Sequence, residues 1–244
     1  ALYILDWSWG KVYAVHLEPE GSSYTATKEE FLIGSPLPVT DAIIHPKDGA
    51  MYVSIGGRRV QSGLYRVTYT GKESTKPAPY KYNKSKLVSL RKKLETFHQK
   101  NPKAIGQAWP NLAHSDRFVR WAARIAVMHQ PLKQWTNKAL KEKDHAKRVE
   151  ALLGLAKMGG IDPFHREDTD SPVNNGLARQ IVNSLLEVDY AKLPTAQKHT
   201  MVRAYQIAFN RFGRPSRGTV EKIVHQLNPH FPAPTFEENW LLCE

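Results

Sequence analysis

The stretch DGAMYVSIGGRRVQSGLYRVTY, from Asp48 to Tyr69, reads as two apolar strands joined by a loop of glycine and arginine. Alternation of apolar and polar residues is the pattern of a β-strand with one buried face. Similar short runs fill residues 1–71, rich in Tyr, Val, Ile and Thr and separated by Gly, Pro, Ser and Asp. We therefore expect this part of the chain to be antiparallel β-structure.

Part of the β-region repeats. LYILDWSWGKVYAVHL, from Leu2, resembles MYVSIGGRRVQSGLYRVTY, from Met51, and matching Tyr3 with Tyr52 gives a period of 49 residues. A period of about 40–50 residues with short strands is typical of β-propeller blades. Residues 1–71 are therefore predicted to be the last one to one-and-a-half blades of a propeller. A small β-meander is the alternative.

The pattern changes after residue 71. Residues 72–83, KESTKPAPYKYN, are rich in Lys and Pro and lack periodicity, which predicts a linker. From residue 84 to residue 244 apolar side chains recur every three or four positions, the period of an amphipathic helix. The first such stripe is Leu87, Leu90, Leu94 and Phe97.

Helix start and stop signals divide this region into eight helices. Asp116 and Asp144 are N-cap residues, and Pro194 precedes a further helix. Gly159 and Gly213 stand where helices should end. Eight helices joined by mostly short turns predict four antiparallel pairs stacked as a HEAT-like α-solenoid over residues 84–244, and a compact helical bundle is the alternative. The predicted fold class is thus α+β and multidomain, a partial β-propeller followed by an α-solenoid.

The net charge of +12 is unevenly distributed along the chain. Residues 1–80 carry eight basic and eight acidic side chains, whereas residues 81–170 carry 19 basic and nine acidic ones, a surplus of ten. Such a basic segment attracts nucleic acid or an acidic partner. It is equally expected of the solvated outer face of a helical array.

Several function classes receive no support from the sequence. The single cysteine, Cys243, excludes an internal disulfide, a multi-cysteine zinc site and a C-x-x-C-H haem attachment in these residues. There is no H-E-x-x-H, G-x-S-x-G, P-loop or Rossmann motif. The acidic loop at 162–170 does not fit an EF-hand, because position 6 counted from Asp168 is Val173 instead of glycine. No metal site is predicted.

The segments Leu2–Tyr69 and HSDRFVRWAARIAVMHQ, up to Gln130, resemble large proteins of planctomycetes and related bacteria. These proteins are described as membrane-bound dehydrogenases with a propeller similar to sugar and sorbosone dehydrogenases. In that family the propeller is followed by HEAT-like repeats and often by a cytochrome c module. The chain begins in a strand-like run and ends in a helical one, so it is expected to be an internal piece of such a protein.

The resemblance implies a function for the longer protein. It would be an extracytoplasmic, periplasmic dehydrogenase that oxidises a sugar or alcohol at pyrroloquinoline quinone and passes electrons to haem c. The helical repeats would be a scaffold towards the electron-accepting haem domain, and the fragment alone would be inactive. No catalytic residue is carried over. A non-catalytic propeller–solenoid scaffold that binds protein or polysaccharide is the first alternative, and a basic solenoid on nucleic acid is the second.

The glycine-arginine loop supplies the candidate ligand-binding residues. Glycine permits positive φ and close backbone approach, and arginine presents a planar fork to carboxylates. The candidate set is Gly56, Gly57, Arg58, Arg59 and Gln61, with Asp41 expected to cap or orient the loop. An ordinary turn with solvated arginines is the alternative.

Three further features have structural interpretations. Asp6 follows an apolar strand and is expected to brace the turn by accepting backbone N–H bonds. Trp7 and Trp9 alternate along a strand, and their rings are expected to pack between blades rather than to stack on a sugar. Arg117, Arg120 and Arg124 recur at helical spacing beside an apolar stripe of Phe118, Trp121 and Ile125, and are expected to pair with acidic residues on adjacent turns.

Overall fold

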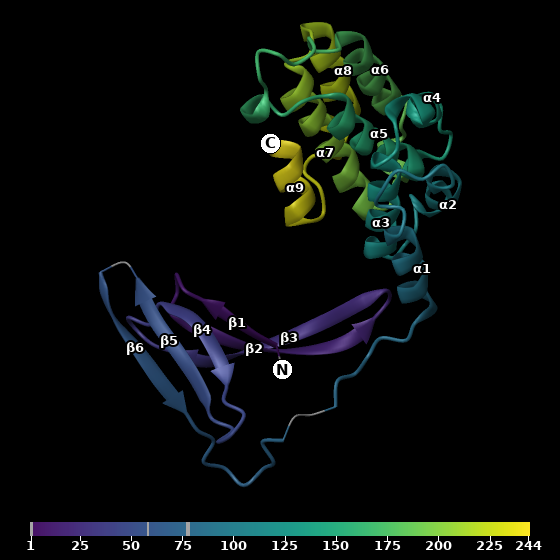
Figure 1. Cartoon of the computed structure of the whole chain (residues 1–244). Helices are drawn as coiled ribbons and strands as arrows, with labels where there is room; N and C mark the ends of the chain where they lie inside the picture. The colour runs from purple at the N-terminus through teal and green to yellow at the C-terminus, as the bar shows by residue number, and fades with distance from the viewer. Residues whose placement is uncertain (1, 58, 77–78) are drawn as a thin grey trace. The chain divides into compact units, whose positions relative to one another are not determined.

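The computed structural model describes residues 2–57, 59–76 and 79–244. The chain divides into two compact units, Ala1–Val88 and Ser89–Glu244. All strands belong to the first unit and nearly all helical residues to the second (Figure 1). The boundary falls inside the first helix, α1 (Lys86–Glu95).

The β-unit consists of two three-stranded antiparallel sheets within the described residues. Each sheet is a meander, with order β1-β2-β3 in the first and β4-β5-β6 in the second. The strands are β1 (Leu2–Asp6), β2 (Lys11–Glu20), β3 (Ser23–Ile33), β4 (Val39–Ile44), β5 (Met51–Gly57) and β6 (Val60–Val67).

The predicted partial propeller is wrong. Propeller blades are four-stranded sheets, whereas each sheet here has three strands in the described part of the chain. The 49-residue repeat also joins strands in different positions. It matches Tyr3 in β1, which lies at a sheet edge, with Tyr52 in β5, which is the central strand of its sheet. Alternation and a Gly-bearing turn describe any antiparallel hairpin, so they predicted the strands but not the sheets.

The two sheets share one hydrophobic core. Buried side chains alternate along the central strand β5, where Met51, Val53 and Ile55 face inward. They pack with Val12 of β2 and with residues of the segment that joins the sheets. The cluster consists of Val12, Leu37, Val39, Met51, Val53 and Ile55, with Tyr3, Leu5, Leu32, Ala42 and Val67 packed against it.

The end of the predicted linker is attached to the β-unit. The Asn83 side-chain amide donates to the carbonyl oxygens of Gly21, at 3.1 Å, and Ser23, at 2.5 Å. The Asn83 N–H donates to the Tyr24 hydroxyl at 3.0 Å, and Lys81 forms an ion pair with Glu18 at 2.8 Å. Residues 81–83 therefore lie along the β2–β3 hairpin.

The described residues of the second unit contain mostly α-helix with short 3₁₀ segments. A ninth α-helix near the C-terminus adds to the eight predicted ones. After α1 the helices are α2 (Ala104–Ala108), α3 (Arg117–Met128), α4 (Thr136–Leu140), α5 (His145–Gly159), α6 (Asn175–Leu186), α7 (Thr195–Phe212), α8 (Arg217–Leu227) and α9 (Phe236–Cys243).

The helices contact one another in an ordered way. α3, α5, α7 and α9 form one row in which each helix contacts the next, and α4, α6 and α8 form another. α3 and α5 run parallel, since Arg120 meets Glu150 and Arg124 lies four residues further on beside Gly154. α5 and α7 also run parallel, since Thr200 meets Glu150 and Arg211 meets Gly160. A HEAT-like solenoid would also arrange its helices in two rows. The solenoid stays a prediction.

The predicted helix ends are confirmed where cap residues set them. The Asp116 carboxylate accepts hydrogen bonds from the N–H groups of Phe118 and Val119, both at 3.0 Å, and Asp144 caps α5 through Lys147 N at 3.1 Å. Gly213 ends α7 with φ of 91°. Such caps satisfy backbone groups that a helix leaves free at its ends.

None of the helices in the described ranges combines the length and the apolar character needed to cross a membrane.

Candidate functional site

The predicted glycine-arginine loop closes the β5–β6 hairpin. Gly57 has φ of 102° and Arg59 has φ of 63°, so both lie in the left-handed region. Arg58 lies outside the described residues. Arg59 and Gln61 are exposed to solvent. The loop therefore has the geometry of a tight turn with a solvated arginine.

One glycine of this loop makes room for Trp7, and the other accepts a hydrogen bond from it. The Trp7 indole Nε1–H donates to the Gly56 carbonyl oxygen at 3.0 Å. A Cβ atom on Gly57 would lie 3.3 Å from Cζ2 of the same ring. The Gly56 N–H donates to the Pro38 carbonyl oxygen at 3.0 Å. The Trp7 ring thus packs against the β5–β6 loop of its own unit. The predicted packing of Trp7 and Trp9 between blades is wrong, because the sheets are not blades and Trp9 is 76% exposed.

In the β-unit, Asp41 and Asp6 each accept a hydrogen bond from a backbone N–H close by in the chain. The Asp41 carboxylate accepts from the N–H of Ala42 at 2.7 Å, beside a bulge in β4. Among the described residues no hydrogen bond or ion pair joins Asp41 to Arg59 or Gln61, so the structure does not bring these candidates together. Asp6 accepts from the N–H of Trp9 at 3.1 Å, which confirms its predicted role in the turn.

A buried ion network lies in the helical unit. Glu150 on α5 is 1% exposed and accepts from Arg120 Nε at 3.0 Å and from Arg124 Nη1 at 2.5 Å. The Thr200 hydroxyl on α7 donates to Glu150 at 3.1 Å. The network thus joins α3, α5 and α7, and its two guanidinium groups outnumber the one carboxylate.

Small side chains on α3 permit this network. The buried face of α3 is formed by Val119, Ala122, Ala123, Ala126 and Val127. The predicted apolar stripe is therefore wrong at Trp121, which is 49% exposed, whereas Phe118 and Ile125 are half-buried. Alanine and Gly154 on α5 let the two helices approach closely, and the long arginine side chains then reach along the outer side of the pair.

Further cations continue along the same side of the helices. Lys157 of α5 is half-buried, and Arg124, Arg203 and Arg211 lie near enough to it to act on its charge. Burial, followed by repulsion from these three guanidinium groups, lowers the pKa of Lys157 below its usual value of 10.5. Within the described residues the Lys157 ammonium has no hydrogen-bonded or ion-pair partner.

Arg211 is held at the end of α5. Its Nη1 donates to the carbonyl oxygens of Lys157 and, at 3.0 Å, Gly160. Cations are stabilised at this end of a helix, where carbonyl groups lack partners. A Cβ atom on Gly160 would lie 2.8 Å from Arg211 Cβ, so glycine is needed for the contact.

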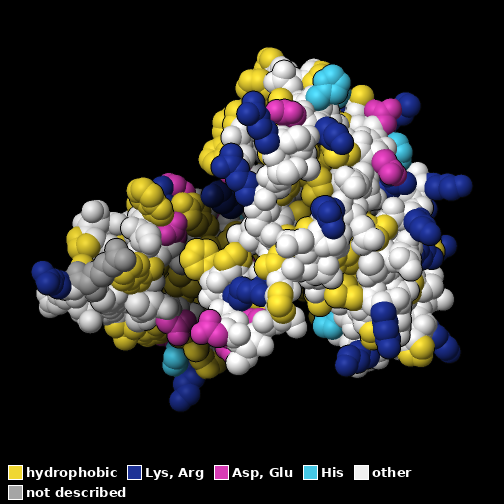
Figure 2. All heavy atoms as spheres, turned by 90° about the horizontal axis from the view of Figure 1, so that it is seen from above, with side chains coloured by type: hydrophobic (Ala, Val, Ile, Leu, Met, Phe, Trp, Pro, Cys, Tyr) yellow, Lys and Arg dark blue, Asp and Glu magenta, His cyan; other side chains and the backbone are white. Residues whose placement is uncertain are grey.

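We call this surface the basic face. It consists of Arg117, Arg120, Arg124, Lys157, Arg203 and Arg211 around Glu150. Six cations and one carboxylate leave an excess of five positive charges. Figure 2 shows that Lys and Arg side chains are scattered over the face in view and that Asp and Glu side chains are fewer there.

A pocket of about 360 Å³ opens on the basic face. Its walls combine cations with two aromatic rings, and the lining residues are Arg117, Phe118, Arg120, Trp121, Arg124, Glu150 and Thr200. The Arg117 guanidinium lies 5.0 Å from the centre of the Phe118 ring and covers it. Trp121 stays open to solvent, with His98 against its edge at 6.2 Å between ring centres.

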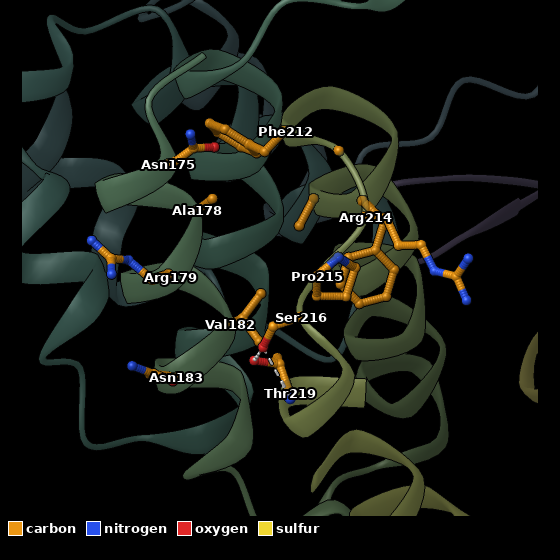
Figure 3. A pocket seen from close by; sticks show the side chains of 13 residues that line it. Asn175, Ala178, Arg179, Val182, Asn183, Phe212, Arg214, Pro215, Ser216 and Thr219 are labelled. Carbon is orange, nitrogen blue, oxygen red and sulfur yellow. Dashed lines mark hydrogen bonds between the residues drawn. The ribbon is translucent and has the colours of Figure 1, made fainter. Parts of the chain in front are cut away.

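A second hollow, of about 240 Å³, lies between α6, α7 and α8 (Figure 3). Val182 and Ser216 point into it, and the Ser216 hydroxyl is already hydrogen-bonded to Thr219 at 3.0 Å. The charged ends of Arg179 and Arg214 point away from it. This hollow therefore offers a ligand little beyond apolar contact.

The described ranges contain no group of three or more His, Cys, Asp or Glu side chains placed to hold a metal ion. In the acidic loop, Asp162 caps a 3₁₀ turn through Phe164 N at 3.1 Å, and Asp170 accepts from Glu167 N at 2.8 Å. Asp162 and Asp170 thus accept hydrogen bonds from the backbone of their own loop.

Comparison with protein-family models, with curated proteins and with solved structures gives no match for this chain. The resemblance to planctomycete dehydrogenases, and the activity, cofactors and location that it implies, stay predictions.

Sequence reasoning found part of the basic face. It placed Arg117, Arg120 and Arg124 on one side of a helix but sought their partners on adjacent turns. The actual partner, Glu150, lies 26 residues beyond Arg124. The usable signal was a lone glutamate within the apolar run RVEALLGLA, where a buried carboxylate requires a cationic partner. Lys157 carries no comparable signal.

Proposed function

We propose that the helical unit is a docking scaffold that binds an acidic partner through the basic face. The observation that supports this most strongly is the charge excess around Lys157. A half-buried ammonium beside three guanidinium groups is costly to maintain in a folded protein unless an anion neutralises it. Within the described residues Glu150 is already occupied by Arg120 and Arg124. A carboxylate of a bound partner would neutralise the positive charge that Glu150 leaves unbalanced.

The arrangement supports binding better than catalysis. Arg120 and Arg124 are fixed by Glu150, and Arg211 is fixed by two backbone carbonyl groups. Rigid guanidinium groups lose little side-chain entropy when they bind carboxylates, which favours recognition. The dehydrogenase implied by the resemblance stays a prediction for the longer protein, in which this scaffold would serve a partner domain or protein.

Binding of fluorescent polyglutamate to the full chain tests the proposal. Fluorescence anisotropy should show binding that weakens steeply between about 50 and about 500 mM salt, because screening shortens the range of the charges. The double variant Lys157→Glu and Arg203→Glu should weaken binding about tenfold or more. The matched control Lys141→Glu and Lys143→Glu changes the net charge equally at two exposed positions outside the basic face.

The control variant should lose no more than about twofold through the overall charge. Equal loss in both double variants would show a non-local effect of net charge and contradict the proposal. So would polyglutamate binding that is the same in the wild-type chain and in the Lys157 and Arg203 variant.

A further inference from the structure

The width of the basic face limits what can lie across it. α3, α5 and α7 contact in that order, and two contacts in each pair show that they run parallel. Neighbouring helix axes lie about 8–10 Å apart, so the distance from α3 to α7 is about 20 Å. An extended peptide covers about 3.3 Å per residue, so about six residues cross the face.

Cations are present on each helix along that crossing. Arg124 belongs to α3, Lys157 to α5, and Arg203 and Arg211 to α7. Arg203 is exposed, and its Nη1 donates only to the Gln206 side-chain amide oxygen, at 2.9 Å, among the described contacts. The row can therefore receive several carboxylates from one extended strand.

An apolar contact lies at the α3 end of the row. The Trp121 ring is 49% exposed, and the His98 ring lies beside it at an angle of 87° between the ring planes. The pocket beside it is edged by the guanidinium groups of Arg117 and Arg124. A partner with a large apolar side chain flanked by acidic residues would match both the exposed ring and the arginines beside it.

A single-stranded nucleic acid is a poorer match to this face. Proteins that bind such strands stack successive bases on several aromatic rings. On the described parts of α3, α5 and α7, the large exposed apolar side chains are Trp121 and Met158, and the Phe118 ring is covered by Arg117. One exposed ring suits one anchor residue better than a row of bases.

We infer that the partner presents an extended acidic peptide of about six residues that crosses α3, α5 and α7 and places one aromatic or aliphatic side chain on Trp121. This inference rests on the proposed function. The acidic residues provide attraction and orientation, and the single apolar anchor provides selectivity.

Three synthetic peptides of this length test the inference against the full chain by fluorescence anisotropy. The first has a phenylalanine at one end of a run of glutamates, the second has alanine in place of phenylalanine, and the third has phenylalanine with glutamines. The first should bind about tenfold more tightly than the second, the usual effect of a buried aromatic anchor. The third should bind weakly.

Variants of the tryptophan separate the anchor from the charges. Trp121→Ala should remove the difference between the first two peptides and leave binding of the alanine peptide unchanged. Trp121→Leu, which keeps an apolar side chain, should retain part of the difference and also guards against a folding defect. Circular dichroism of each variant should match that of the wild-type chain.

The other outcomes test the apolar anchor, the acidic scaffold and the peptide nature of the partner separately. If both glutamate peptides bind equally and Trp121→Ala changes nothing, the anchor is wrong and the acidic scaffold stands. If no glutamate peptide binds, both proposals fail. If a single-stranded oligonucleotide of equal charge displaces the first peptide at lower concentration than the unlabelled peptide itself, the assignment of a peptide partner is overturned.

Discussion

The molecule gathers arginine in two places, and the two differ in what surrounds the charge. In the β5–β6 loop Arg59 is exposed in a tight turn, next to two glycines that are in contact with Trp7. On the basic face Arg120 and Arg124 are fixed by a buried carboxylate. Composition makes the loop look like a binding site. The contacts make the helical face the better candidate, because fixed cations with excess charge recognise anions more effectively than solvated ones.

The largest expected effect comes from the centre of the ion network. Glu150→Ala should lower the free energy of unfolding of the helical unit by about 3–5 kcal/mol, because it leaves Arg120 and Arg124 without their shared carboxylate. Urea unfolding followed by far-ultraviolet circular dichroism measures this. The control Glu221→Ala removes a 65% exposed carboxylate and should cost less than about 1 kcal/mol. If both substitutions lowered the free energy of unfolding equally, arginines fixed by a buried carboxylate would contribute no more to stability than solvated ones.

A smaller effect is expected in the glycine-arginine loop. Gly57→Ala should destabilise the β-unit by about 1–3 kcal/mol, because alanine is strained at φ of 102° and its Cβ would press on Trp7. Hydrogen exchange of the backbone amides of β5 and β6, followed by mass spectrometry, reports on this unit. Gly49→Ala is a matched control, with φ of 68° but no atom within 4 Å of the added Cβ. If both substitutions cost the same, the Trp7 contact contributes nothing.

Lys157→Met should raise the free energy of unfolding by about 1 kcal/mol. The same substitution should weaken polyglutamate binding, because residues that serve a binding site often lower the stability of the fold. The pKa of Lys157 is lowered in the folded chain, mainly by burial. The unfolded chain therefore binds more protons just below pH 10.5, and the wild-type chain gains stability as pH rises through that window. The difference in stability between the Lys157→Met variant and the wild-type chain should therefore become smaller as pH rises towards 10.5.

Thermal unfolding of both chains from neutral to alkaline pH measures this difference. The same comparison with Lys143→Met, at an exposed position outside the basic face, should show no such trend. A stability gain that stays constant up to alkaline pH would contradict the role given to the Lys157 charge.

The smallest effect is expected at Arg59. Arg59→Gly relieves a side chain held at φ of 63°, partly offset by the greater freedom of glycine in the unfolded chain. Stability should change by less than about 1 kcal/mol, and affinity for polyglutamate should be unchanged. Isothermal titration calorimetry and urea unfolding check the two parts. A marked loss of affinity would return the loop to the list of binding sites.

Local signals predicted local structure well. Alternation located the strands, Asp116 and Asp144 marked helix starts, and Asp6 was assigned correctly to its turn. Each of these depends on contacts within a few residues of the chain. The same reasoning failed for the sheets, because nothing in a hairpin pattern states how many strands a sheet has or which strand is central.

The candidate site shows the same limit. Spacing placed Arg117, Arg120 and Arg124 together, but it put Trp121 inside the protein, where the structure leaves it half exposed. An alanine-rich face and a bulky aromatic face compete for burial on one helix. In the folded chain Gly154 of α5 lies against Arg124 and Met128 of α3, and Trp121 is left at the surface.

The sequence by itself determined the two kinds of secondary structure, the turn and cap residues and the concentration of basic charge, since all of these follow from neighbouring residues and composition. Tertiary structure alone decided that two meanders share a core and that Glu150 meets Arg120 and Arg124. It also decided that Lys157 lies among cations without a described partner. These contacts join residues that are far apart in the chain, and only the packing of whole elements brings them together.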